Sequence, residues 1–210
     1  PCYAGGIDLE LSLEALLRQT DRNLERGFRA IKMKVGRPRL AEDVERVAAM
    51  RRHLGDGFPL MADANMKWSA DVAIRAARAF APYDLVWLEE PVIPDDVAGH
   101  ARVVAEGGVP VASGENLRSL WEFKQLVVAG GVTYPEPDVT NCGGITVFMK
   151  IARLMEVPNL LPMPSHRPTP ISNPRTLAAQ SDRQWHTKPS LTSPSTVAPG
   201  ASLIQVKPGG

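Results

Sequence analysis

Short apolar runs alternate with longer amphipathic segments along most of this chain, and their regular spacing leaves few folds open to it. The apolar runs cover residues 30–35, 59–63, 85–89, 109–113, 132–138 and 160–166. Runs of this length are typical of buried strands in a parallel sheet. The segments between them carry helix signals, such as Ser12 before residues 13–24 and Gly55 after residues 40–54, because these residue types begin and end helices. One strand and one helix in roughly every 25–30 residues predict successive βαβ units and an α/β fold.

The residues that end these runs favour a barrel over a doubly wound sheet. They are Lys34, Asp63, Glu89, Glu115, Asp138 and His166, at steps of 29, 26, 26, 23 and 28 residues. A (β/α) barrel gathers the carboxyl ends of all its strands at one mouth, whereas a doubly wound sheet binds its ligand at one switch point. No G-x-G-x-x-G follows the first strand, which disfavours dinucleotide binding. We therefore predict a (β/α) TIM-type barrel.

Composition divides the chain after His166. Residues 167–210 contain seven of the 19 prolines and eleven Ser and Thr, and their net charge is +4, against −3 for residues 1–166. A segment of this kind buries too little apolar surface to offset the entropy lost on ordering. We therefore expect a partial barrel domain over residues 1–166 and a disordered or non-native tail over 167–210, with at most a weak strand at 202–206.

Charge and cysteine content exclude several classes of protein. The formal net charge is +1, from 24 Lys and Arg against 23 Asp and Glu, so no phosphate-seeking surface is expected and nucleic-acid binding is disfavoured. No run of 18 apolar residues is present, so no membrane-spanning helix is predicted. The two cysteines, Cys2 and Cys142, cannot form a disulfide framework, and a cytoplasmic location is expected.

Three carboxylates end successive strands. Asp63, Glu89 and Glu115 would face one cavity, where their mutual repulsion calls for a bound cation, and all-oxygen ligation suits Mg²⁺ or Mn²⁺. Any one of them could be an unrelated surface acid, but the repeated step of 26 residues favours a metal site. Glu89 and Glu90 point to opposite faces of their strand, so only one is expected to be a direct ligand, and the sequence leaves open which.

Two lysines share one face of a predicted strand. Lys32 and Lys34 lie about 6.6 Å apart along it, and their apolar neighbours suit the helix-facing side. Adjacent ammonium groups lower each other's pKa, which makes one of them a usable base. The apolar neighbours argue against an exposed edge strand with two solvated lysines. A Schiff-base lysine is a further alternative, but the nearby carboxylates favour proton abstraction.

Asp138 and His166 end consecutive later strands and can approach each other. A carboxylate fixes the tautomer of an imidazole and raises its basicity. Alone, a histidine in a Pro-flanked loop is more often structural, but opposite the lysine pair it becomes a second base. A metal with one base on each face of the substrate suits abstraction of the proton α to a carboxylate, because the metal stabilises the enediolate.

The ordered motifs together resemble the mandelate racemase and muconate lactonizing enzyme family of the enolase superfamily. They are K-M-K, D-A-N, L-E-E-P, S-G-E-N, P-D-V-T-N-C-G-G-I-T and P-S-H, spread over residues 1–166. The resemblance implies that Asp63, Glu89 and Glu115 bind Mg²⁺. It also implies a small-molecule substrate, either a sugar acid or a 2-hydroxy acid.

The same resemblance assigns the remaining roles. Lys34 would be one acid/base and the His166–Asp138 dyad the other. Lys32 would support the enolate and tune Lys34, while Asn65 would touch the substrate or metal-bound oxygens. The reaction implied is α-proton removal followed by β-elimination of water, as in a sugar-acid dehydratase. A racemase or epimerase using the same two bases is the alternative.

The chain also departs from the family pattern. Residues 1–6 would already be the first barrel strand, so we expect the N-terminal capping domain of the family to be absent. No Glu follows Glu156, so we also expect the eighth strand with its substrate-binding Glu to be absent. We therefore expect an incomplete barrel of about seven βα units from a truncated chain. A catalytically dead remnant is a further alternative, and a homo-oligomer is expected of the intact protein.

Overall fold

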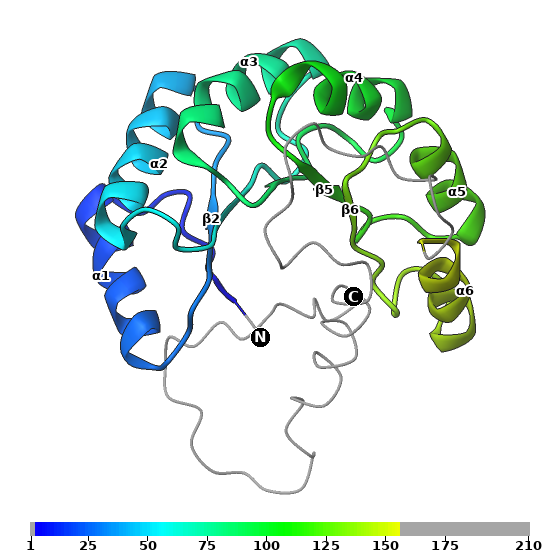
Figure 1. Ribbon diagram of the computed structural model, residues 1–210, viewed down its shortest axis with the longest axis horizontal. Helices are drawn as coiled ribbons and strands as arrows, with labels where there is room; N and C mark the ends of the chain where they lie inside the picture. Colours follow the sequence, from blue (N-terminus) through cyan, green and yellow to red (C-terminus); the bar gives the residue numbers. More distant parts are fainter. Residues whose placement is uncertain (1–2, 156–210) are drawn as a thin grey trace, which may run out of the picture.

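The computed structural model describes residues 3–155, which form a six-stranded parallel sheet with six α-helices along its outer side (Figure 1). Consecutive strands are neighbours, in the order β1-β2-β3-β4-β5-β6, and every pair is parallel. This is the arrangement of a partial (β/α) barrel, as the sequence predicted. The expected strands at 160–166 and 202–206, and His166 itself, lie outside the described residues.

Strands β2 to β6 fall within the predicted apolar runs but are shorter, and β1 lies within the first strand expected at residues 1–6. They are β1 (Ala4–Gly5), β2 (Ile31–Lys34), β3 (Leu60–Asp63), β4 (Leu88–Glu89), β5 (Val111–Ser113) and β6 (Tyr134–Pro135). The run at 132–138 yields only two strand residues. Pro135 and Pro137 have no amide hydrogen to donate, so they interrupt the ladder there.

The helices match the predicted segments closely. They are α1 (Leu13–Glu25), α2 (Leu40–Leu54), α3 (Ala70–Phe80), α4 (Val97–Gly107), α5 (Leu120–Val128) and α6 (Ile145–Met155), with a short 3₁₀ helix, η1 (Ala81–Tyr83). The Ser12 hydroxyl caps α1 by accepting from the Ala15 amide at 3.2 Å. Gly55 ends α2 with a φ of 81°, a conformation that glycine adopts without steric penalty. Within residues 3–155, no helix is long and apolar enough to cross a membrane.

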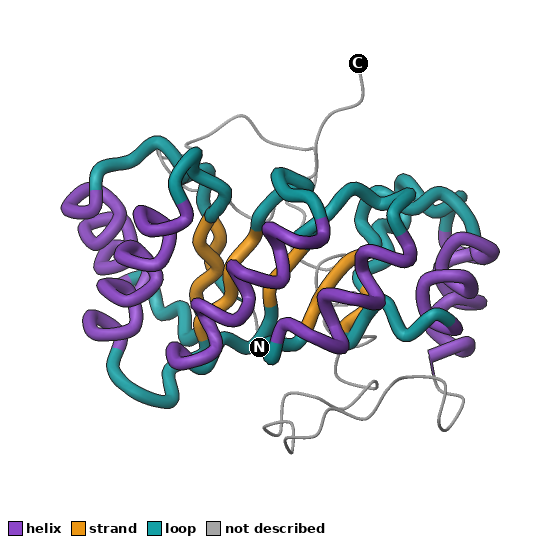
Figure 2. The backbone as a smooth tube through the Cα atoms, turned by 90° about the horizontal axis from the view of Figure 1, so that it is seen from above, coloured by secondary structure: helices purple, strands orange, loops and turns teal. Residues whose placement is uncertain are grey.

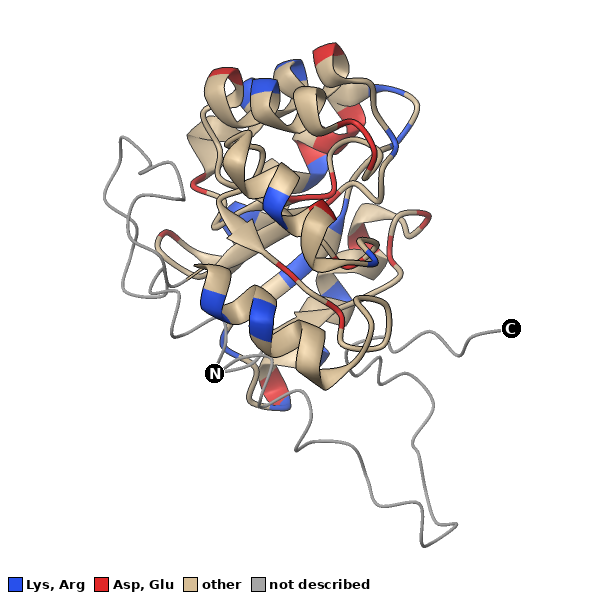
Figure 3. Ribbon diagram, turned by 90° about the vertical axis from the view of Figure 1, so that its right-hand side faces the viewer, with Lys and Arg blue, Asp and Glu red and all other residues tan. Residues whose placement is uncertain are grey.

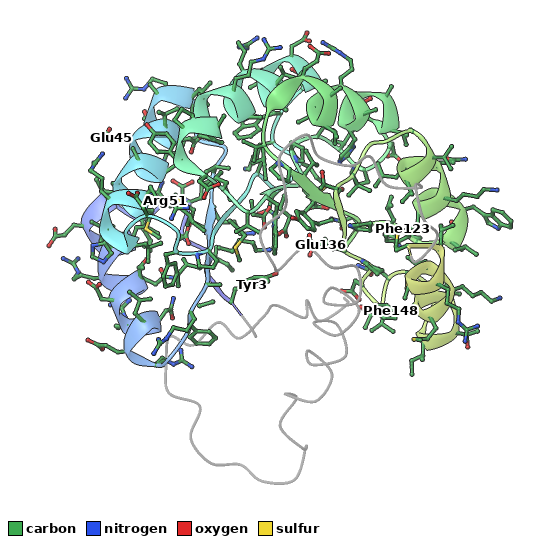
Figure 4. All side chains as sticks on the ribbon, viewed as in Figure 1. Tyr3, Glu45, Arg51, Phe123, Glu136 and Phe148 are labelled. Atoms are coloured by element: carbon green, nitrogen blue, oxygen red, sulfur yellow. The ribbon has the colours of Figure 1, made fainter. Side chains whose placement is uncertain are left out.

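The helices form an outer arc and the strands an inner one (Figure 1). Seen from above, the helices cover the strands (Figure 2). Basic and acidic residues both occur along the helices (Figure 3). The largest core cluster fills the space between the sheet and the helices, and includes Met33, Val47, Leu60 and Phe80. A second cluster joins α5 and α6 through residues such as Phe123 and Phe148 (Figure 4).

The inner face of the sheet carries a separate apolar cluster. Met61, Trp87, Ala112 and Tyr134 form a separate cluster, on strand positions that alternate with the helix-facing ones. On β2, the helix-facing residues are buried in the main core whereas Lys32 and Lys34 are partly exposed. The predicted orientation of the lysine pair is therefore confirmed.

Candidate active site

The register of the sheet places two lysines and two carboxylates side by side at the carboxyl ends of β2, β3 and β4. Lys34 pairs with Asp63, and Asp63 pairs with Glu89. The Lys34 Nζ atom lies 2.5 Å from Asp63 Oδ2, and Lys32 Nζ lies 2.5 Å from Glu89 Oε1 and 3.5 Å from Asp63 Oδ2. These ion pairs form a continuous ladder across three strands.

The ambiguity between Glu89 and Glu90 is resolved by the backbone. Glu89 is 2% exposed and shares the inner face with Trp87, whose Nε1 donates to Glu89 Oε2 at 3.0 Å. Glu90 has a φ of 41°, which breaks the strand alternation. Its Oε1 accepts from Asn116 Nδ2 at 2.5 Å. Glu89 is therefore the acid beside the lysines, and Glu90 faces the end of β5.

Asn65 and Glu115 lie in the loops that follow β3 and β5. The Asn65 amide donates to Asp63 Oδ1 at 2.9 Å, so this loop turns back on the carboxylate. The Glu115 carbonyl accepts from Asn141 Nδ2 at 2.8 Å. Across residues 3–155, no three His, Cys, Asp or Glu side chains lie close enough together to hold a metal ion. The three predicted ligands thus lie at neighbouring strand ends without forming a closed set of donors.

The donor set nevertheless has the chemistry of a cation site. Asp63, Glu89 and Glu115 offer only carboxylate oxygens, the donors that Mg²⁺ prefers. Beside them, the Oε2 atom of Glu90 is buried without a hydrogen-bond partner. Unpaired buried acceptors are costly in a folded protein. The residues present therefore fit a hard divalent cation.

Burial and the two ammonium groups set the protonation of this cluster. Burial opposes ionisation of Asp63, yet Lys32 and Lys34 hold the pKa of Asp63 below its ordinary value. Burial raises the pKa of Glu89, with Lys32 opposing the rise. Burial works against the charge of Lys32 too, but Glu89, Tyr3 and Asp63 raise the pKa of Lys32 well above its ordinary value. The lowered pKa expected for the lysine pair is therefore wrong for Lys32, because its ammonium group lies beside the Glu89 and Asp63 carboxylates.

The structure places Asp138 in a local turn. Its Oδ1 accepts from the Thr140 amide at 2.6 Å and from Thr140 Oγ1 at 2.5 Å. This is an Asx-type turn, in which the side chain stabilises the backbone two residues on. The predicted partner, His166, lies outside the described residues, so the dyad stays a prediction.

Glu136 is an acid of this site that the sequence reasoning missed. Figure 4 shows it on the inner side of the sheet with Tyr3, whereas Glu45 points outward from α2. Burial raises the pKa of Glu136 well above its ordinary value, and the Glu89 carboxylate adds to the rise. Glu136 is two residues before Asp138, so the alternation along a strand could have placed it on the same face.

Asp8 is a second buried acid that was missed. It lies in the loop between β1 and α1, is 2% exposed, and its Oδ1 accepts from the Lys34 amide at 2.8 Å. The Arg46 guanidinium lies 3.7 Å from the same oxygen and donates to the Asp8 carbonyl at 2.8 Å. Burial raises the pKa of Asp8 to about 6, against the Lys34 and Arg46 contacts that lower it. No local sequence pattern signals these contacts, because they join residues 26 and 38 positions apart.

The parallel sheet with helices outside it defines the class of (β/α) barrel proteins. Ionisable residues lie at the carboxyl ends of its consecutive strands. Comparison with known families gives the narrower assignment. A family model described as enolase C-terminal domain-like matches residues 15–183. The chain belongs to this family, and the resemblance predicted from its motifs is confirmed.

Similar proteins include enzymes of sugar-acid metabolism. The chain is 64% identical over 156 residues to a 3,6-anhydro-alpha-L-galactonate cycloisomerase of Streptomyces coelicolor, an alignment that covers 74% of this chain and 43% of the relative. A solved racemase from Streptomyces coelicolor with bound magnesium superposes with a TM-score of 0.73 at 64% identity, covering 74% of this chain and 47% of that one. An L-talarate dehydratase from Polaromonas sp. JS666, solved with Mg and L-glucarate, superposes with a TM-score of 0.70 at 42% identity, covering 74% and 44%. The chain thus spans about two fifths of the length of the curated relative.

Proposed function

We propose that this protein removes the proton α to the carboxylate of a sugar acid with the help of Mg²⁺, and then eliminates water from the β position. The observation that carries the proposal is the ladder of Lys34, Asp63, Lys32 and Glu89 across three strand ends. It joins cation-binding acids to a proton-transfer group at one place. The relatives solved with magnesium, one of them also with L-glucarate, support the same chemistry.

Asp63, Glu89 and Glu115 would hold the cation. When bound, Mg²⁺ supplies positive charge that stabilises the enediolate formed by α-proton removal. Asn65, whose backbone already contacts Asp63, would bind substrate oxygens. The buried Trp87 indole holds one oxygen of Glu89 in place, which fixes the direction of the other.

The two lysines would have different roles in the reaction because their surroundings differ. Lys32 stays an ammonium group because Glu89, Tyr3 and Asp63 raise its pKa, so it would stabilise negative charge on the substrate. Lys34 is then the base that would take the α-proton at Nζ. On the other face, His166 with Asp138 would act as the second acid/base and would protonate the departing hydroxyl.

A second candidate is isomerisation after the same first step. The relative that is 64% identical is named a cycloisomerase and the similar solved structure a racemase. Both outcomes need α-proton removal and differ in what the second acid does with the intermediate. The third possibility is a catalytically dead protein that keeps these residues but does not convert a substrate. The proposal also includes a sugar-acid substrate and a cytoplasmic location. It further includes assembly as a homo-oligomer, with no nucleic-acid or membrane partner.

Exchange of the substrate α-proton for deuterium tests the proposal. The full 210-residue chain would be incubated with a panel of sugar acids in deuterated water, with MgCl₂ or with EDTA, and exchange followed by proton NMR. We expect Mg²⁺-dependent exchange that Lys34→Ala lowers at least about a hundredfold, the scale of a lost acid/base group. Lys124→Ala, which removes an exposed lysine on α5, is the matched control and should exchange like the wild type.

The stereochemistry of exchange tests the two-base assignment. Lys34→Ala should abolish exchange on one face of the α-carbon and His166→Ala on the other. Equal residual exchange of both epimers in both variants would contradict the assignment. Folded protein without any exchange would favour the inactive alternative.

A further inference from the structure

Glu90 occupies an unusual place at the end of β4. It is 1% exposed, yet one carboxylate oxygen, Oε2, has no hydrogen-bond partner. Its backbone has a φ of 41°, a region that non-glycine residues rarely adopt. Both features are unfavourable for a folded protein, so a purely structural acid would gain nothing from them.

The backbone of Glu90 joins the strand ends on both sides of it. Its amide donates to the Ala112 carbonyl on β5 at 2.9 Å. Its carbonyl accepts from the Met66 amide at 2.7 Å, in the loop three residues after Asp63. Glu90 therefore ties the end of β3 to the end of β5 through β4.

The side chain of Glu90 makes a second link toward β5. Oε1 accepts from Asn116 Nδ2 at 2.5 Å, and Asn116 directly follows Glu115. Asn116 Nδ2 also lies 3.9 Å from Met66 Sδ. The loops that follow β3, β4 and β5 thus meet around Glu90 and Asn116.

The strained residues of the described chain gather at the same junction. Asn65, Met66 and Glu90 are three of the four non-glycine residues with positive φ in residues 3–155, and Asp84 is the fourth. Asn65 and Met66 follow Asp63 closely, and Glu90 follows Glu89. The segments that directly follow two of the predicted ligands are thus held in sparsely populated backbone conformations.

We propose that Glu90 is a positioning residue that sets the spacing of Asp63, Glu89 and Glu115 for Mg²⁺, an inference that rests on the proposed function. We assign it no direct bond to the ion because Asn116 holds its Oε1, while its unpaired Oε2 is a buried polar oxygen that a nearby cation would stabilise. Residues that orient metal ligands typically affect metal affinity by about 10- to 100-fold. Removing the Glu90 side chain should have an effect of that size.

Isothermal titration of the full chain with MgCl₂ alone tests this inference. Glu90→Ala is expected to weaken Mg²⁺ binding at least about tenfold. Glu90→Gln keeps an oxygen acceptor for Asn116 and should stay within about threefold of the wild type, whereas Glu89→Gln should abolish binding. Urea unfolding in EDTA would show whether each variant is folded, and a role in stability alone would leave the affinity of folded protein unchanged.

Asn116→Ala offers a second route to the same answer if Glu90→Ala fails to fold. It should weaken Mg²⁺ binding by a similar factor, because it removes the hydrogen bond through which Glu90 holds the end of β5.

Three results would count against the inference. Wild-type affinity in folded Glu90→Ala or Asn116→Ala would overturn the positioning role and leave the proposed function standing. Loss of binding in Glu90→Gln as complete as in Glu89→Gln would make Glu90 a direct ligand and overturn it as well. A wild-type chain that binds no Mg²⁺ would overturn the proposed function itself.

Discussion

Replacing Asp8 by asparagine should remove a pH dependence that burial gives to the stability of the fold. Burial raises the pKa of Asp8 from 3.8 to about 6 although Lys34 and Arg46 both favour the ionised form. The folded protein therefore holds the Asp8 proton more tightly than the unfolded chain does. By linkage, the free energy of unfolding falls as the pH rises from about 4 to about 6. At roughly 1.4 kcal/mol per pH unit, the fall reaches about 3 kcal/mol.

Asparagine keeps an oxygen that can accept from the Lys34 amide, and it does not titrate. The raised pKa of Asp8 already includes the Arg46 ion pair, so the substitution itself adds only an offset to the free energy of unfolding that does not change with pH. The free energy of unfolding of Asp8→Asn should therefore rise relative to the wild type by about 3 kcal/mol between about pH 4 and pH 7. Urea unfolding followed by tryptophan fluorescence at several pH values measures this difference. A difference that stays constant with pH, or that grows in favour of the wild type, would refute the reasoning.

Two further predictions concern the scaffold. Arg51→Ala should lower the free energy of unfolding by about 3 kcal/mol, measured by urea unfolding. The reason is that its buried guanidinium (Figure 4) donates to four backbone carbonyls, those of Tyr83, Asp84, Gly55 and Phe58. A loss below about 1 kcal/mol would contradict this prediction. Gly114→Ala should destabilise about 2 kcal/mol more than Gly55→Ala. Both glycines have positive φ, but an added Cβ at Gly114 would lie 2.6 Å from the Phe123 ring whereas at Gly55 it would meet nothing within 4 Å. Equal melting temperatures for the two glycine variants would show that the Phe123 contact is unimportant.

The sequence predicted those parts of the fold that depend on local pattern. Alternation along β2 placed Lys32 and Lys34 opposite the buried Ile31 and Met33, and the structure has the same alternation. Ser12 and Gly55 marked helix ends correctly because capping depends on neighbouring backbone groups.

Parts of the site could not be predicted because they depend on the backbone or on distant partners. Alternation could not choose between Glu89 and Glu90, since the positive φ of Glu90 ends the regular strand at that point. The pKa of Lys32 was misjudged because the register of β2, β3 and β4 brings the Asp63 and Glu89 carboxylates to its ammonium group. Asp8 was missed because Arg46, which lies beside it, is 38 residues away. The role of His166 and the disordered or non-native tail at residues 167–210 stay predictions, because these residues lie outside the described part of the chain.

The sequential strand order has a consequence for how the chain assembles. Paired residues of adjacent strands are between 22 and 29 positions apart. Loop-closure entropy grows only with the logarithm of loop length, so the cost of closing these loops differs by about 0.2 kcal/mol. Each strand can therefore add to the last at nearly the same entropic cost, in the order in which the ribosome releases them. Lys34 meets Asp63 first and Glu89 joins afterwards, so the ion-pair ladder can grow with the sheet, one strand at a time.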